Sequence, residues 1–135
     1  MKARRAWLIA GLAVLAGVTP ALAADLVDKV KVELESTEHH PGMEPGMYVC
    51  AAGHLHLRGT AQNLADVALG PIKVAGKALD AAGKVLGTAT ASTAARRLEP
   101  GAKAGFDLEF PTVTGPRIQQ VRTHEIKVVD APVAR

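Results

Sequence analysis

The chain has 135 residues, with 16 Lys and Arg against 13 Asp and Glu, and a single cysteine. This length allows one domain, and one cysteine excludes an internal disulfide. Lys2, Arg4 and Arg5 stand in a segment that we expect to be removed, which leaves 13 basic against 13 acidic residues. A near-neutral chain lacks the basic surface that nucleic-acid binding requires, so we expect no nucleic-acid partner.

The first residues carry the pattern of a secretory signal peptide. A basic start is followed by an apolar run from Ala6 to Val18 and by the small-x-small cleavage site Ala21-Leu22-Ala23. That run is shorter than the ~20 residues of a membrane-spanning helix, and no second run of its length follows. We therefore expect a signal peptide over 1–23 and a mature domain over 24–135, with its core at about 28–130. The mature protein is expected to be periplasmic or secreted, without a membrane span.

Segments with alternating apolar and polar residues follow one another along the mature chain. In the first, Val30, Val32 and Leu34 alternate with charged residues, which predicts a half-buried strand. Further strands are expected from Tyr48 to Ala61, Ile72 to Leu79, Val85 to Ser92, Gly105 to Phe110 and Ile118 to Val129. The alternation is clearest in the segment with both phenylalanines, which we expect to point into the core.

Turn and loop signals separate these strands. Asp80-Ala-Ala-Gly83 suits a type I turn, and Glu99-Pro-Gly-Ala102 suits a type II turn. Proline and glycine pairs predict a loop from Thr37 to Met47, and prolines bound another at 111–116. The pattern predicts an all-β fold, a single antiparallel β-sandwich of six to seven strands. The alternative, a helix over the Ala-rich residues 75–98, is disfavoured by its glycines.

The motifs of residues 55–110 follow a recognisable order. Leu-x-Leu-x-Gly59-Thr-x-x-Asn63 is followed by Leu79-Asp80-x-x-Gly83-x-Val, and then by Leu98-x-Pro-Gly101 before Phe106. This order resembles the FxLYD domains, which are immunoglobulin-like β-sandwiches of envelope proteins. The resemblance implies an immunoglobulin-like topology and an accessory, binding or scaffold role in the cell envelope. It supplies no catalytic residues.

Metal-ligating residue types are concentrated in one part of the mature chain. Of its eight histidine, methionine and cysteine residues, only His124 lies outside the segment 39–56. Imidazole and thioether donors together suit copper. The candidate ligands of a copper site are His39, His40, Met43, Met47, His54 and His56, and Cys50 is a candidate reactive or dimer-forming thiol.

The spacing of these donors along the expected strand divides them into groups. In one extended strand, Cys50 and His54 are ~13 Å apart, which is too far for a nucleophile and its base. His54 and His56 share a face, with their backbone positions ~7 Å apart. A single site then requires the preceding loop to fold over the strand. The competing interpretation gives these residues no ligand role, with Cys50 as a small buried hydrophobic residue.

Two functions from different classes follow from these patterns. The first expectation is a non-enzymatic protein-interaction module of the envelope, without a cofactor. Its expected partner is another envelope protein, which could add a strand to an exposed sheet edge of this domain. The alternative is a periplasmic copper-binding or copper-handling protein that uses the His/Met cluster. The sequence lacks the nucleophile elbow, phosphate loop and dinucleotide motifs of common enzymes, so we expect no catalytic activity.

Overall fold

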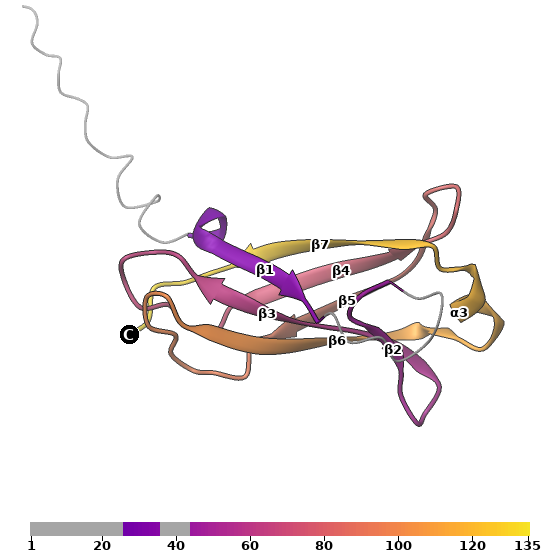
Figure 1. Cartoon of the computed structure of the whole chain (residues 1–135), viewed down its shortest axis with the longest axis horizontal. Coiled ribbons are helices and arrows are strands. Elements are labelled where there is room, and N and C mark those ends of the chain that lie inside the picture. Colours follow the sequence, from indigo (N-terminus) through magenta and orange to yellow (C-terminus); the bar gives the residue numbers. More distant parts are fainter. Residues whose placement is uncertain (1–25, 36–43) are drawn as a thin grey trace, which may run out of the picture.

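The computed structural model describes residues 26–35 and 44–135, so the expected signal peptide lies outside the described part. Most described residues form strands, and the strands build two antiparallel sheets (Figure 1). The elements in chain order are η3 (Val27–Lys29), β1 (Val30–Leu34), β2 (Met47–Val49), β3 (His54–Asn63), β4 (Lys73–Leu79), β5 (Val85–Ser92), β6 (Lys103–Thr114), α3 (Pro116–Gln120) and β7 (Thr123–Asp130). The expectation of an all-β fold is confirmed.

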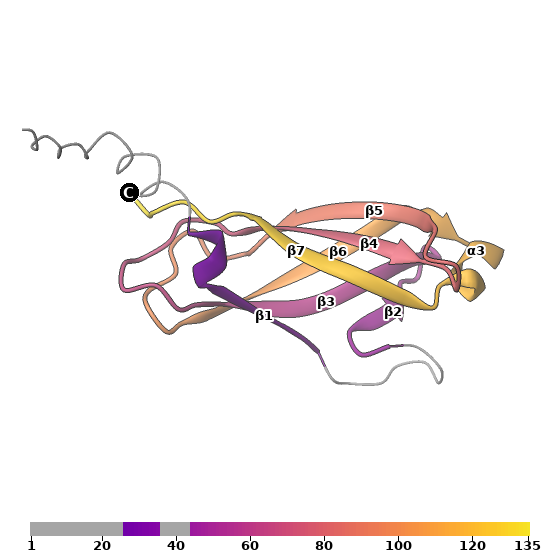
Figure 2. The same cartoon turned by 90° about the horizontal axis from the view of Figure 1, so that it is seen from above.

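Strand β3 organises the first sheet. It pairs with β1 and β2 in succession along one side and with β6 along the other. The second sheet has the order β5-β4-β7. The longer strands run along the long axis of the molecule, and in Figure 2 β1 and β3 lie on one side and β4 and β5 on the other.

The core lies between the sheets and is built by strand alternation. In β3, and in β6 as far as Phe110, every second residue is buried, which places Leu55 and Leu57 beside Leu108 and Phe110 in one apolar cluster. A Cβ at Gly76 of β4 would lie 2.8 Å from the Leu108 side chain, so the two sheets are in close contact there. The same alternation turns the polar residues of β3 and β6 outward, on one exposed face.

Two residues of the sequence motif have identifiable structural roles. A Cβ at Gly59 would lie 2.5 Å from the carbonyl oxygen of Glu33, so only glycine allows β1 to approach β3 this closely. Asn63 is fully buried at the end of β3. Its side-chain nitrogen donates hydrogen bonds of 2.9 Å to the carbonyl oxygens of Val67 and Leu98, and its side-chain oxygen accepts one of 2.8 Å from the Ala65 N–H. Asn63 therefore ties the following loop to the sheet.

The prediction of one continuous strand from Tyr48 to Ala61 is wrong. A tight turn at residues 50–53 divides the segment into β2 and β3, which run antiparallel to each other. The Gly53 N–H donates to the Cys50 carbonyl oxygen (2.9 Å), and the Cys50 N–H donates to the His54 carbonyl oxygen (3.0 Å). Gly53 has φ +87°, which is the left-handed conformation that closes a hairpin of this kind.

The C-terminal segment also differs from the prediction. The expected loop at 111–116 is shorter, because β6 continues to Thr114. The expected strand from Ile118 to Val129 begins only at Thr123, after the short helix α3. Pro116 is suited to the first turn of a helix, because backbone N–H groups there have no hydrogen-bond partner within the helix. Within the described residues, no helix is long and apolar enough to cross a membrane.

Candidate functional site

The β2–β3 hairpin brings Cys50 next to the histidines of β3. Because the chain reverses direction between Cys50 and His54, the Cys50 Sγ lies 4.0 Å from His54 Nδ1. The separation of ~13 Å that an extended strand predicts is therefore wrong. The hairpin extends at the end of the molecule where α3 also lies (Figure 1), and no folding-over of the preceding loop is needed to bring these donors together.

Pairing of β3 with β6 adds two carboxylates to the same face. His56 lies opposite Glu109, and Arg58 lies opposite Asp107, in the antiparallel register. Residues that are diagonal across two strands are also within reach of long side chains. His54 Nδ1 accordingly lies 2.8 Å from Glu109 Oε2, and His56 Nδ1 lies 2.8 Å from Asp107 Oδ1.

Three potential ligand atoms converge at this point. The Cys50 Sγ, a ring nitrogen of His56 and a carboxylate oxygen of Glu109 all lie within 4.8 Å of one another. His54 contacts two of these three residues, at 4.0 Å from the Cys50 sulfur and 2.8 Å from the Glu109 oxygen. We call Cys50, His54, His56 and Glu109 the four-donor cluster.

Asp107 and Tyr48 both contact the His56 ring. The Tyr48 hydroxyl donates a hydrogen bond to Asp107 Oδ2, and the Tyr48 ring stacks on the imidazole at 4.8 Å between centroids. Burial by itself lowers the pKa of His56, but the hydrogen bond to Asp107 and the neighbouring Cys50 outweigh it and raise the pKa above its usual value. The imidazole is therefore held in one place by a carboxylate and an aromatic ring.

The environment of Cys50 favours its thiolate. The backbone N–H of His54, followed by smaller contributions from the Ala52 backbone and the His56 side chain, lowers the pKa of Cys50 to about 7. The thiolate is the form of cysteine that binds metals and reacts with electrophiles. At neutral pH the cluster thus contains a substantial fraction of the ligating species.

Alkylation of Cys50 in the metal-free protein is expected to follow a titration with a midpoint of about 7. Since only the thiolate reacts, the rate should fall as the pH drops below this midpoint and level off above it. The measurement is the rate of iodoacetamide labelling across a pH series in the presence of a chelator. The urea-unfolded chain is the control, and a folded-state midpoint at the ordinary value of 9.0 would contradict the prediction.

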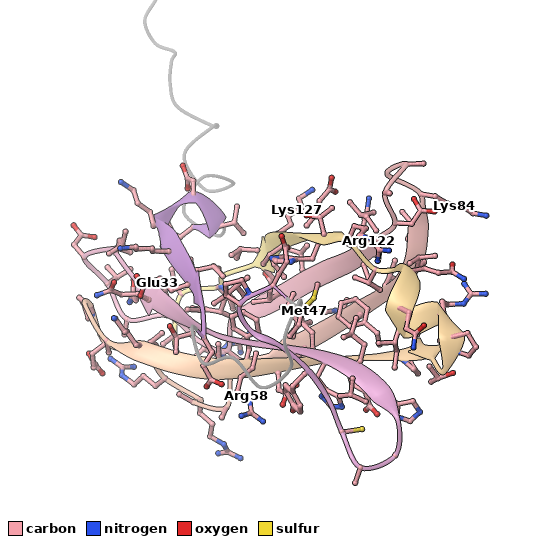
Figure 3. All side chains as sticks on the ribbon, turned by 45° about the vertical axis from the view of Figure 1, so that its right-hand side comes forward. Glu33, Met47, Arg58, Lys84, Arg122 and Lys127 are labelled. Carbon is pink, nitrogen blue, oxygen red and sulfur yellow. The ribbon has the colours of Figure 1, made fainter. Side chains whose placement is uncertain are left out.

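The candidate ligands predicted from the sequence have different positions. His54, His56 and Cys50 come together, whereas Met47 pairs with Leu57 and is buried in the core. Figure 3 shows Met47 inside the molecule and Arg58 on its surface. His124 lies apart, with its Nδ1 2.8 Å from a Glu44 oxygen. The remaining candidates, His39, His40 and Met43, lie outside the described residues.

Sequence reasoning did not include Tyr48, Asp107 and Glu109 in the site. The alternation around Phe106 and Phe110 already predicts that Asp107 and Glu109 point outward. The alternation does not give the register that pairs Asp107 and Glu109 with residues about fifty positions earlier in the chain. One local signal was present, because Cys50-Ala-Ala-Gly53 ends in the same three residues as the recognised turn Asp80-Ala-Ala-Gly83.

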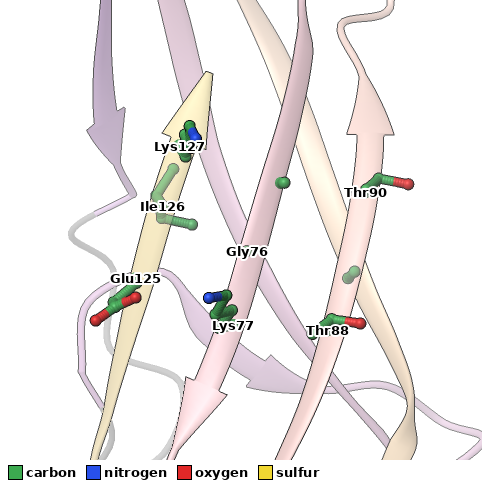
Figure 4. A pocket seen from close by; sticks show the side chains of 9 residues that line it. Gly76, Lys77, Thr88, Thr90, Glu125, Ile126 and Lys127 are labelled. Carbon is green, nitrogen blue, oxygen red and sulfur yellow. The ribbon is translucent and has the colours of Figure 1, made fainter. Parts of the chain in front are cut away.

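A groove of about 590 Å³ lies on the other sheet, away from the four-donor cluster. Figure 4 shows that its lining side chains come from β4, β5 and β7. The charged and hydroxyl residues around it are Lys77, Lys127, Glu125, Thr88 and Thr90. This mixture of lysine, glutamate and threonine does not indicate one class of ligand, so we assign no function to the groove.

Comparison of the chain with protein-family models, curated proteins and solved structures finds no significant match. The resemblance to FxLYD domains thus stays a prediction from sequence motifs.

Proposed function

We propose that the protein binds a transition-metal ion at the four-donor cluster, and that zinc suits this cluster best. The observation that carries the proposal is the convergence of Cys50 Sγ, a His56 ring nitrogen and a Glu109 oxygen within 4.8 Å of one another. His54, which contacts both Cys50 and Glu109, provides the fourth donor. All four side chains come from two adjacent strands and one tight turn.

Three of these donors lie close to the separations that a tetrahedral ion requires. Zinc binds sulfur at ~2.3 Å and nitrogen or oxygen at ~2.0–2.2 Å, which places neighbouring ligand atoms about 3.3–3.8 Å apart. The distances between donor atoms of different residues include 2.8 Å between His54 and Glu109, 4.0 Å between Cys50 and His54, and 4.0 Å between His56 Nε2 and Glu109. Cys50, His56 and Glu109 already lie within 4.8 Å of one another, whereas His54 lies outside that group and has to move to join them around one ion.

The donor set differs from the methionine-containing copper site that the sequence predicts. Zinc binds thiolate, imidazole and carboxylate ligands alike, whereas the copper hypothesis relies on thioether sulfur beside imidazole. Met47 is buried in the core on the opposite face of the sheet from His56, so it adds no thioether to the cluster. The carboxylate of Glu109 is a hard oxygen donor, which is poorly suited to Cu(I).

Titration of the chelator-treated protein with zinc, Cu(I) and Cu(II) tests this function. We expect one zinc ion per chain with submicromolar affinity. Cobalt(II), used as a spectroscopic substitute, should give a thiolate charge-transfer band and intense visible bands typical of tetrahedral coordination. Absence of zinc binding tighter than micromolar would overturn the proposal, and tight binding of copper alone would shift it to the copper alternative.

A second candidate function is a protein-interaction module of the cell envelope. It agrees with the FxLYD resemblance, with an immunoglobulin-like topology and with the secreted or periplasmic location that the N-terminal sequence predicts. The observation in its favour is strand β5, an edge strand of the second sheet whose eight residues include no proline and no charged residue. Edge strands are normally protected by such residues, and edges that lack them can pair with an extended segment of a partner; at one end of β5 the Arg117 side chain donates to the Leu86 carbonyl oxygen.

A photoreactive side chain placed on β5 tests the second candidate. A probe at Thr90, on the exposed face of β5, should cross-link in intact cells to an extended segment of an envelope protein that peptide mapping identifies. The same probe at Lys127, on the opposite edge of that sheet, is the control. Equal cross-linking from both positions, or none from Thr90, counts against strand addition at β5.

A further inference from the structure

The two nitrogens of the His56 ring have very different surroundings. Nδ1 lies 2.8 Å from Asp107 Oδ1 and 3.2 Å from the Tyr48 hydroxyl. Nε2 is buried, has no hydrogen-bond partner among the described residues, and lies 4.0 Å from a Glu109 oxygen. A buried polar nitrogen without a partner normally costs stability, and such exceptions call for an explanation.

We propose that Asp107 is a positioning residue that makes His56 a metal ligand through Nε2. A carboxylate that accepts a hydrogen bond from Nδ1–H fixes the neutral ring in the tautomer whose lone pair is on Nε2. That lone pair is then on the nitrogen that lies 4.0 Å from a Glu109 oxygen, and it remains available for an ion. The inference rests on the proposed metal binding, and it assigns the unpartnered Nε2 a function.

Asp107 is itself held from two sides. The Tyr48 hydroxyl donates to its Oδ2, so the two carboxylate oxygens have separate partners. The Arg58 guanidinium lies 3.6 Å from the same Oδ2 and 4.4 Å from the centre of the Tyr48 ring. A carboxylate with fixed donors on both oxygens orients the imidazole more firmly than a mobile one. These contacts all come from β2, β3 and β6, which are the strands that supply the cluster.

The two carboxylates of β6 therefore have different roles. Glu109 reaches His54 Nδ1 at 2.8 Å and approaches His56 from the Nε2 side, so it faces the place where an ion would bind. Asp107 contacts His56 on the Nδ1 side, on the opposite edge of the ring. Only Glu109 is placed to be a ligand, and only Asp107 is placed to orient one.

The test combines a tautomer measurement with zinc affinity. In the metal-free protein at alkaline pH, nitrogen NMR of the His56 ring should show hydrogen on Nδ1 and none on Nε2. Asp107→Ala should lose this preference and should bind zinc ~10–100-fold more weakly, the range typical for groups that support metal ligands. Asp107→Asn should recover most of the affinity, because its side-chain oxygen can still accept from Nδ1–H.

Two further variants separate positioning from a general loss of structure. Tyr48→Phe keeps the ring but removes the hydrogen bond to Asp107, and it should weaken zinc binding by a few-fold while the tautomer is retained in part. Glu99→Gln removes a carboxylate that contacts Arg97 in a distant turn, and it should leave both readouts unchanged.

Each result bears on one of the two proposals. Wild-type affinity in Asp107→Ala, or an Nε2–H tautomer in the wild-type protein, would overturn the positioning role of Asp107. If the wild-type protein binds no zinc, the proposed function fails, while the tautomer of the metal-free protein still decides whether Asp107 orients His56.

Discussion

Replacement of Cys50 by serine is expected to lower the affinity for zinc by more than about a hundredfold. A serine hydroxyl stays protonated at neutral pH and offers a far weaker ligand than a thiolate. The structure places this sulfur 4.0 Å from His54 Nδ1 and within 4.8 Å of the ligand atoms of His56 and Glu109. No other cysteine exists in the chain to replace it.

Competition with a chromophoric zinc chelator measures this change, and cobalt spectra give an independent readout. The thiolate charge-transfer band of the cobalt form should be absent in Cys50→Ser. Ala52→Ser is a matched control, because it places a hydroxyl in the same turn, on an exposed residue, without removing a donor. If Cys50→Ser keeps wild-type affinity, the thiolate is not a ligand and the cluster must be reassigned to its histidines and carboxylate.

The second large effect concerns folding stability. Asn63→Leu is expected to lower the free energy of unfolding by about 3–9 kcal/mol, since it leaves three backbone groups without their partner at a cost of ~1–3 kcal/mol each. These groups are the carbonyl oxygens of Val67 and Leu98 and the N–H of Ala65. Leucine is larger than asparagine, so it leaves no cavity, and any cost of overpacking at this buried position adds to the loss of the hydrogen bonds.

Urea denaturation of the metal-free protein measures the change in stability. Gln62→Ala is the matched control, because Gln62 is the neighbouring residue and makes one hydrogen bond of 3.0 Å, to the Gly101 carbonyl oxygen, at an exposed position. Its loss should cost less than about 1 kcal/mol. An Asn63→Leu protein as stable as the Gln62→Ala protein would show that water replaces the lost partners, and that the Asn63 network contributes little.

Much of the sheet structure could be predicted because strands and turns leave local signals. The alternation of Phe106, Leu108 and Phe110 with polar residues gave both the strand and its buried face. The turn at Glu99–Ala102 was predicted from proline and glycine, and the Ala102 N–H indeed donates to the Glu99 carbonyl oxygen at 3.0 Å. The turn at Cys50–Gly53 was missed because cysteine, unlike aspartate, is not a typical first turn residue.

The candidate site depended on that missed turn and on long-range pairing. One extended strand keeps Cys50 and His54 far apart, whereas the hairpin brings their side chains to 4.0 Å. Likewise, nothing near Glu109 in the sequence indicates His56 as its cross-strand neighbour. The density of donors between residues 39 and 56 indicated metal chemistry, but the copper ligands proposed from it included Met47, which packs in the core.

The sequence by itself determined the all-β character, the buried faces of the strands and the outward direction of His54, His56, Asp107 and Glu109. These properties follow from alternation with a period of two, which any strand imposes on its own residues. The tertiary structure alone decided that β3 pairs with β6 in the register that sets these four side chains together. Register is fixed by core packing between distant segments, so it is a property of the folded chain and not of either strand.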